Sequence, residues 1–206
     1  MPTQRRIRFP VVLGALVLLC AVGAIALMVV RGPLGAPPAE GNLVGADVGG
    51  PFTLVDGDGK TVTDKDFAGR YRLVYFGYTF CPDVCPTDVQ RMMQGFAAFE
   101  AKDPERAAKV APIFVSVDPE RDTPSVVKQF AAAFHPRLVG LTGSRAQVDA
   151  AKKTFRVYAA KRGEGKDYLM DHSAMVYLFG PDGKPIAFVA QPTPQEVAAD
   201  LDRYVS

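Results

Sequence analysis

The sequence predicts an α/β domain, in which helices flank a central sheet, preceded by one N-terminal transmembrane helix. Three observations predict this class: an uncharged run near the N-terminus, strand-like and helix-like segments that alternate through the remainder, and a closing hairpin with a last helix. The 206 residues suit one globular domain with an appendage. The net charge of +2 is small and spread out, and no basic block with interleaved aromatic residues indicates a nucleic-acid partner.

The first element is a predicted membrane anchor. Residues 9–30 are 22 residues without a charge, and about 20 apolar residues are enough to span a hydrocarbon core. Three arginines precede the run and hold the N-terminus in the cytoplasm, so the residues after Arg31 lie on the far side of the membrane. We therefore expect a cytoplasmic N-terminus (1–8), the anchor (9–30), a flexible tether rich in Gly, Pro and Ala (31–50), and a globular domain (51–206).

Two alternatives to an uncleaved anchor fit the residues less well. Ala24-Ile25-Ala26 resembles the cleavage site of a signal peptide, but four more apolar residues (27–30) prolong the run beyond it. A lipoprotein would need a small residue before Cys20, and Leu19 stands there. An uncleaved anchor places the domain in an oxidising compartment. We expect the outer side of a bacterial cytoplasmic membrane rather than a mitochondrion, because no long presequence rich in Arg and Ser is present.

The domain begins with a predicted hairpin and then a buried strand. Residues 52–55 and 61–63 read as two strands joined by a Gly-containing turn at 56–59. Residues 73–76 form an apolar run typical of a strand that is buried on both faces. A helix with an apolar stripe follows over about 83–101.

The middle of the domain repeats this order. A second apolar strand is predicted over 111–117, followed by an acidic loop. Thr123 caps a helix over 124–134, which has proline at its first position. A short strand over 138–141 precedes a helix from Ser144 to about Lys161.

The last elements are a hairpin, with strands over 175–179 and 186–189 joined by a turn at 180–183, and a helix over 193–204. Strands that alternate with helices, followed by a hairpin and a helix, indicate a sheet with helices on both faces. This order matches a thioredoxin-like core.

Cys81 and Cys85 stand where the strand over 73–76 turns into the next helix. The positive end of a helix dipole favours thiolate, which attacks disulfides and binds soft metals. Residues four apart at a helix start lie on one face, so both sulfurs can converge on one atom. A structural disulfide is the least favoured interpretation, because reactive thiols occupy such turns. A disulfide-exchange site usually has two intervening residues and here has three, so a redox dithiol and half of a metal site both remain open.

Only two histidines are present, and they differ in context. His135 is followed by proline at a helix end and is expected to be a surface or capping residue. His172 lies in a loop that a thioredoxin-like fold places beside the cysteine turn, where oxidoreductases carry a cis-proline and this chain has none. Two thiolates and an imidazole suit Cu(I) and can also hold Cu(II) or zinc. A satisfied core histidine remains the alternative, and Asp171 is a candidate to orient the ring.

Three segments carry a family resemblance. They are FGYTFCPDVCP (76–86), SVDPERDTP (116–124) and DHS (171–173), in this order. The first closely resembles the signature of the Sco/SenC family of copper-binding, thioredoxin-like assembly factors for cytochrome c oxidase. The other two are similar to that family's acidic loop and ligand-histidine motif. The resemblance covers roughly residues 45–205, and an N-terminal anchor with a short tether also fits the family.

The resemblance implies a copper site made by Cys81, Cys85 and His172, with Cu(I) and also Cu(II) as the ion. It implies a membrane-anchored copper chaperone, with the copper-centre subunit of cytochrome c oxidase and a periplasmic copper donor or thiol reductant as partners. A thiol-disulfide reductase that uses Cys81 and Cys85 as its dithiol is the rival class. A peroxiredoxin-like peroxidase ranks third, because Tyr78 stands where the peroxidatic motif has Thr or Ser.

Overall fold

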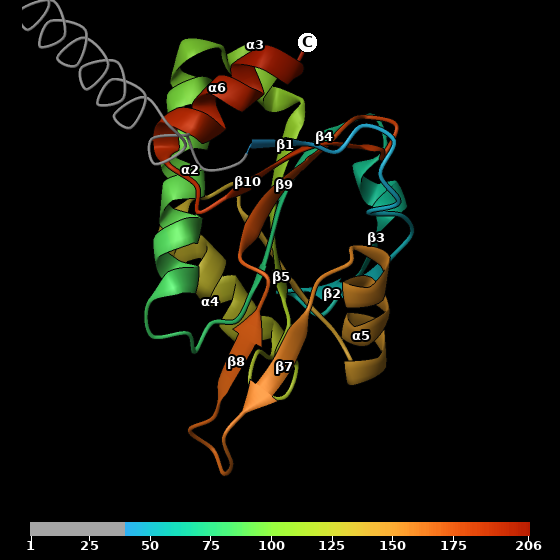
Figure 1. Ribbon diagram of the computed structural model, residues 1–206, viewed down its shortest axis with the longest axis vertical. Coiled ribbons are helices and arrows are strands. Elements are labelled where there is room, and N and C mark those ends of the chain that lie inside the picture. Colours follow the sequence, from blue (N-terminus) through green and yellow to red (C-terminus); the bar gives the residue numbers. More distant parts are fainter. Residues whose placement is uncertain (1–39) are drawn as a thin grey trace, which may run out of the picture. The chain divides into compact units, whose positions relative to one another are not determined.

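The computed structural model describes residues 40–206 and builds them around an eight-stranded sheet in the order β1-β10-β9-β4-β5-β6-β2-β3 (Figure 1). Two further strands, β7 and β8, form a separate two-stranded sheet. The strands are β1 (Glu40–Asn42), β2 (Thr53–Asp56), β3 (Thr61–Thr63), β4 (Tyr71–Gly77), β5 (Val110–Ser116), β6 (Val139–Thr142), β7 (Ala159–Arg162), β8 (Leu169–His172), β9 (Met175–Phe179) and β10 (Pro185–Ala190). The helices are η2 (Asp64–Phe67), α2 (Val84–Lys102), α3 (Pro104–Ala108), α4 (Pro124–Phe134), α5 (Arg145–Thr154) and α6 (Pro194–Tyr204).

The predicted anchor and most of the tether lie outside the described residues. Within residues 40–206, no helix has the length and apolar character needed to cross a membrane. The predicted α/β class with a closing hairpin is confirmed for the domain, and the structure adds that the central strands β4, β5 and β6 are parallel.

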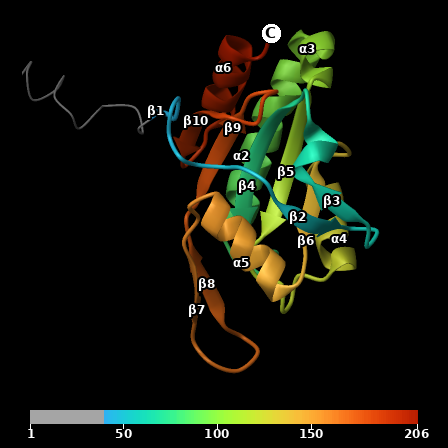
Figure 2. The same ribbon diagram turned by 90° about the vertical axis from the view of Figure 1, so that its right-hand side faces the viewer.

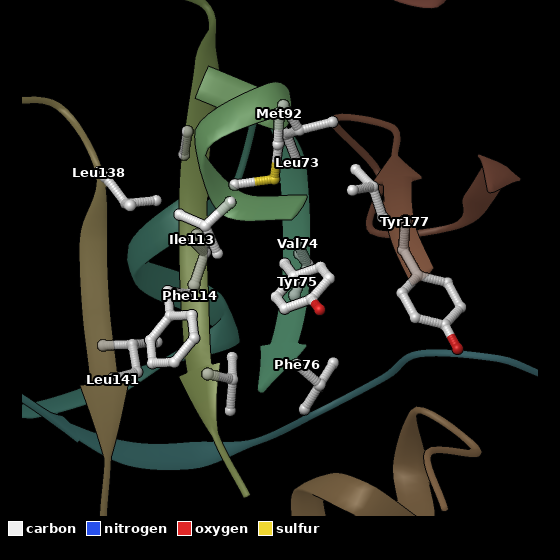
Figure 3. Packing of buried hydrophobic residues seen from close by; sticks show 14 of the residues in the cluster. Leu73, Val74, Tyr75, Phe76, Met92, Ile113, Phe114, Leu138, Leu141 and Tyr177 are labelled. Carbon is white, nitrogen blue, oxygen red and sulfur yellow. The ribbon is translucent and has the colours of Figure 1, made fainter. Parts of the chain in front are cut away.

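The core lies on both faces of the central strands β4 and β5, which are parallel and buried along their whole length. Helices α2, α4 and α6 cover one face of the sheet, and α5 lies on the other (Figure 1). Tyr75 reaches Asp88 of α2, whereas the ring of Phe76 packs 5.1 Å from that of Phe155, which follows α5. A strand covered on both faces must be apolar at successive positions, and this explains the run in the sequence. Figure 3 shows side chains of β4, β5 and β6 lying side by side in this core.

One predicted helix is too long. The helix predicted from Ser144 to about Lys161 ends at Thr154, with Phe155 as its C-cap. Arg156 then adopts a positive φ of 55°, which ends the helix, and the chain turns into β7. Glycine is the usual residue at such a left-handed position. Because position 156 is arginine, the sequence does not indicate that the helix ends there.

Three strands were not predicted. β1 lies in the segment expected to be tether, and it pairs with β10 through Gly41 opposite Phe188. The last tether residues are also attached, because the Gly49 N–H donates to the Thr154 carbonyl at 3.0 Å. The domain therefore begins before residue 51. β7 and β8 form an antiparallel hairpin that extends from the domain (Figure 2).

The parallel register of β4 and β5 positions the candidate site. Gly77 pairs with Ser116, so both strands end at the same edge of the sheet. The segment after β4 carries the two cysteines, and we call residues 78–85 the cysteine turn. The segment after β5, residues 117–123, is the acidic loop. In parallel sheets the carboxyl ends of the strands are the usual place for a functional site.

Candidate metal centre

The cysteine turn places one sulfur at the start of α2 and the other just before it. Asp83 is the N-cap residue of α2 but makes no side-chain capping hydrogen bond. The first N–H groups of a helix lack partners within the helix. The Cys85 N–H instead donates to the Cys81 Sγ at 3.4 Å. The predicted helix start near Asp83 is confirmed, and the sulfur of Cys81 receives a free donor of the helix N-terminus.

The two thiols differ in exposure and acidity. Cys81 is half-buried, whereas Cys85 is 0% exposed. Burial acts to raise the pKa of Cys81, but hydrogen bonds from the backbone of Cys85 and Asp83 outweigh it, and the pKa lies below its ordinary value. Burial raises the pKa of Cys85 above its ordinary range. The expectation that the helix N-terminus favours thiolate therefore holds for Cys81, whereas burial outweighs this effect at Cys85.

His172, 87 residues further along the chain, lies next to the buried thiol of Cys85. Its Nε2 lies 3.0 Å from the Cys85 Sγ. Its Nδ1 lies 3.1 Å from the Ser173 carbonyl oxygen. Because a carbonyl only accepts, Nδ1 carries the proton and Nε2 presents its lone pair to the sulfur. Burial lowers the pKa of His172, so the ring is neutral near pH 7.

Aromatic rings and backbone, not Asp171, orient the imidazole. Tyr75 and Tyr78 pack edge-on against it, with ring centroids 6.2 and 5.8 Å away. Asp171 is exposed and lies 3.6 Å from Arg162. The structure therefore does not support the predicted role of Asp171, and the Ser173 carbonyl takes that place.

The sulfur and nitrogen donors suit a soft metal, but the distance between Cys85 Sγ and His172 Nε2 is that of a hydrogen bond and not that of two ligands on one metal ion. Among residues 40–206, no group of three His, Cys, Asp or Glu side chains is arranged to hold a metal ion. Donors about 2.0–2.3 Å from a tetrahedral metal are roughly 3.5 Å apart, which exceeds the Sγ–Nε2 distance of 3.0 Å. An ion between these two donors would therefore need the imidazole to withdraw slightly.

Asp122 of the acidic loop supports the cysteine turn, a role that no local feature of the sequence indicates. Asp122 is completely buried. Its carboxylate accepts hydrogen bonds from the Thr79 N–H at 3.1 Å, the Thr79 hydroxyl at 2.6 Å and the Ser116 hydroxyl at 2.5 Å. Burial raises the pKa of Asp122, and these donors oppose the shift. The acidic segment that follows a predicted strand indicates a loop at 117–123. It does not indicate that Asp122 of this loop bonds to Thr79.

Asp88, one helical turn after Cys85, is a second buried acid beneath the site. It accepts a hydrogen bond from the Tyr75 hydroxyl at 3.2 Å. Burial raises its pKa. The sequence offers no signal for this pair, because Asp88 is the only charged residue of an otherwise buried helix face.

His135 is not brought to the cysteines. It is the C-cap of α4, its ring packs edge-on at 5.4 Å from that of Phe96, and its Nε2 lies 3.5 Å from Glu100. Its side chain is only 16% exposed. The predicted position at a helix end is confirmed, and the ring is partly buried there.

Comparisons with known proteins agree on one family. A family model described as SCO1/SenC matches residues 41–206. Protein SCO1 homolog, mitochondrial, of Homo sapiens is 40% identical over 157 residues, which are 75% of this chain and 52% of that protein. Protein SenC of Rhodobacter capsulatus is 44% identical over 156 residues, which are 75% of this chain and 69% of SenC. The chain thus spans about half the length of the human relative.

Solved structures agree with the sequence comparison. The structure of Bradyrhizobium japonicum ScoI with copper bound aligns with a TM-score of 0.69 at 46% identity, covering 77% of this chain and 99% of that one. The predicted thioredoxin-like arrangement of the domain is therefore one that copper-bound relatives share.

Proposed function

The chain belongs to the SCO1/SenC family, and from this membership we propose that it is a membrane-anchored copper chaperone. Copper is its cargo, held by Cys81, Cys85 and His172 and passed on during assembly of the binuclear copper centre of cytochrome c oxidase. The observation that carries the proposal is the 3.0 Å contact between Cys85 Sγ and His172 Nε2, two donors 87 residues apart in the chain. Two thiolates with one imidazole are a donor set that favours Cu(I).

Copper uptake is coupled to proton release. The ligand form of cysteine is the thiolate, and the pKa of Cys85 is raised by burial, so that thiol loses its proton as the metal binds. His172 is already neutral and presents Nε2 without losing a proton. Cys81, with its lowered pKa, supplies the more available thiolate.

Delivery proceeds by ligand exchange that begins at Cys81. Cys81 is the partly exposed donor, whereas Cys85 and His172 are shielded. A thiolate of the acceptor forms a bond to copper, the bond to Cys81 breaks, and the released Cys81 thiolate can take up a proton. Exchange at Cys85 and His172 follows, and the copper passes without a change in its oxidation state.

The acceptor is the copper-centre subunit of cytochrome c oxidase, and a periplasmic copper donor or thiol reductant prepares the site. The anchor at 9–30 holds the chain in the cytoplasmic membrane as a single-pass protein, with the domain on the periplasmic or other outer side.

A thiol-disulfide reductase is the second candidate. The observation that favours it is the asymmetry of the pair: Cys81 is accessible with a lowered pKa, and Cys85 is buried with a raised one. Attacking thiols need the first property, and the second suits a resolving thiol that acts only after a mixed disulfide has formed.

Copper analysis of the purified 206-residue chain tests the proposal. Cys20 is replaced by serine so that only the two site thiols can bind. The reduced protein, loaded with Cu(I) without oxygen, should hold one copper per chain. The oxidised protein should hold none, because a disulfide sulfur is no longer a charged ligand. Undiminished copper binding by the oxidised chain would exclude this site.

Complementation of an oxidase-deficient strain separates delivery from reduction. Delivery needs all three donors, so Cys81→Ser, Cys85→Ser and His172→Ala should all fail, with partial rescue by added copper because mass action bypasses a weak carrier. Full rescue by His172→Ala alongside failure of both cysteine variants would favour the reductase.

A further inference from the structure

Arg121 lies where the acidic loop meets the hairpin and is not one of the three candidate copper ligands. Its Nε donates to Asp118 Oδ2 at 2.6 Å, and its Nη1 donates to the Tyr168 carbonyl oxygen at 2.9 Å. Asp118 is almost completely buried and also accepts a hydrogen bond from the Tyr168 hydroxyl at 2.6 Å. Together, Arg121 and Asp118 hold both the backbone and the side chain of Tyr168, the residue just before β8.

Arg121 also contacts the cysteine turn. Its Cζ lies 3.6 Å from the ring centroid of Tyr168, 5.0 Å from that of Phe80 and 5.7 Å from that of Tyr78. All three distances are within the range of cation–π attraction, about 6 Å. Its Nη2 is buried without a hydrogen-bond partner among the described residues, so the ring faces are what stabilise this part of the guanidinium. The side chain thus lies between the cysteine turn and the hairpin.

The hairpin needs such support because it is not part of the main sheet. β7 and β8 pair only with each other, and an isolated two-stranded hairpin is marginally stable in water. At its base, Tyr158 and Ser173 exchange two hydrogen bonds of 3.0 and 3.1 Å. At the other end of β8, Tyr168 is four residues before His172, about 13 Å along an extended strand. The Arg121 contacts therefore fix the start of the strand that carries the imidazole.

We propose that Arg121 is a positioning residue for His172: by holding Tyr168 against the cysteine turn, it sets the approach of the imidazole to Cys85 and so the affinity of the site for copper. This inference rests on the proposed copper function. The role requires arginine, because a planar guanidinium donates in two directions while its face lies on a ring, whereas an ammonium group does not.

A double-mutant cycle tests the coupling. Affinity for Cu(I) is measured by competition with a chromophoric chelator, on the reduced 206-residue chain in the Cys20→Ser background. Arg121→Met should weaken copper binding about tenfold, the lower end of what outer contacts of a metal site contribute. In the His172→Ala background the same substitution should change nothing, since the residue it positions is gone. An equal loss in both backgrounds, or no loss in either, overturns the proposal.

Two further variants test whether the effect is specific to the arginine side chain at position 121. Lys161→Met is the matched control, because it removes another cation that lies 3.8 Å from the Tyr168 ring centroid but, within residues 40–206, has a side-chain hydrogen bond only to Glu120. It should leave the affinity unchanged. Arg121→Lys keeps the charge and should still weaken binding several-fold. If Arg121→Met does not fold, wild-type affinity in Arg121→Lys is the result that rejects the proposal.

A metal-free measurement keeps this proposal separate from the copper function. In the copper-free chain, Arg121→Met should speed amide hydrogen exchange in β7 and β8 by about tenfold and leave β4 and β5 unchanged. If the wild-type chain takes up no copper, the proposed function fails, and this measurement alone then decides whether Arg121 holds the hairpin. Unchanged exchange in the hairpin means that it does not.

Discussion

The cysteine turn and the β7–β8 hairpin supply donors to the same site but are held in opposite ways. The turn joins two elements of the domain core, and the buried Asp122 carboxylate accepts three hydrogen bonds from Thr79 and Ser116 around it. The hairpin pairs only with itself and extends beyond the main sheet (Figure 2). One half of the site is thus built into the fold, and the other half is attached to it by side chains.

This difference suits a carrier that must both hold and release a metal. A donor on a separately attached hairpin can move by the fraction of an ångström that an ion between Cys85 and His172 requires, without disturbing the core. A donor on the core keeps its place through the exchange. Local stability that varies across a domain in this way is common where a ligand binds.

The largest expected effect compares the donors of the two halves. Cys81→Ser or Cys85→Ser should leave no copper bound after gel filtration, because a hydroxyl is a poor ligand for Cu(I). His172→Ala should weaken binding roughly 100-fold and still leave copper on the two thiolates, if each ligand contributes about 3 kcal/mol. Chelator competition measures both. Equal losses in all three variants would remove the distinction, and His135→Ala is the control that should change nothing.

The second prediction concerns the stability of the copper-free chain. Asp122→Ala should lower the free energy of unfolding by about 3 kcal/mol, because it leaves the buried donors of Thr79 and Ser116 unpaired. Tyr168→Phe removes the hydroxyl that attaches the hairpin to the acidic loop through Asp118 at 2.6 Å and Glu120 at 3.3 Å, and should cost about 1 kcal/mol. Urea unfolding of the two variants checks the contrast. A larger loss from Tyr168→Phe would mean that the hairpin, not the turn, is the better-supported half.

The turn could be predicted from the sequence because its signals are local. An apolar run, two cysteines and a helix start follow one another over 73–85, and the structure has them in that order. Thr123 with Pro124 marked the next helix for the same reason, and α4 begins there. The support from Asp122 joins residues 43 apart, and no local pattern announces such a bond.

The hairpin could not be predicted, because its strands lack the usual signals. Ala159–Arg162 and Leu169–His172 carry charged residues and no β-branched ones, since the hairpin buries little of its surface. The end of α5 at Thr154 could not be predicted either, because the left-handed residue that follows it is Arg156 and not glycine. His172 was identified as a candidate ligand from its place before β9 and from the family resemblance, but the strand that carries it was expected to be a loop.

The third prediction uses thiol reactivity to probe how the hairpin covers the turn. In the reduced chain near neutral pH, iodoacetamide should modify Cys81 at least about tenfold faster than Cys85, because Cys81 is more exposed and its pKa is lowered. His172→Ala removes the ring that lies against Cys85 and should speed its modification without affecting Cys81. Peptide mass spectrometry assigns the sites. Faster modification of Cys85 in the wild-type chain would contradict the burial described above.

The smallest expected effect is a pH dependence that has opposite signs in the two halves. The pKa of His172 is lowered by burial, so its contribution to stability is present above the unfolded value of 6.5 and is lost as the pH falls through the folded value. The pKa of Asp122 is raised by burial, so its contribution is present below the unfolded value of 3.8 and is lost as the pH rises through the folded value. Acid therefore disfavours the hairpin side of the site and favours the turn side.

The difference between wild type and His172→Ala isolates the contribution of His172 together with its electrostatic interaction with Asp88. Asp122, which has no such interaction with His172, contributes equally to both chains. Urea unfolding of the copper-free proteins at about pH 7.5 and about pH 5.5 spans the histidine range. The wild-type chain should lose more stability than the variant as the pH falls over this interval. Only the wild-type chain has an imidazole at position 172, and that imidazole takes up a proton more readily in the unfolded state than in the folded state. His135→Ala, which removes the histidine that lies away from the cysteines, should keep the wild-type trend. If His172→Ala loses as much stability as the wild-type chain, the imidazole is not held neutral against Cys85, and the hairpin then supplies a donor that is already free to move before copper arrives.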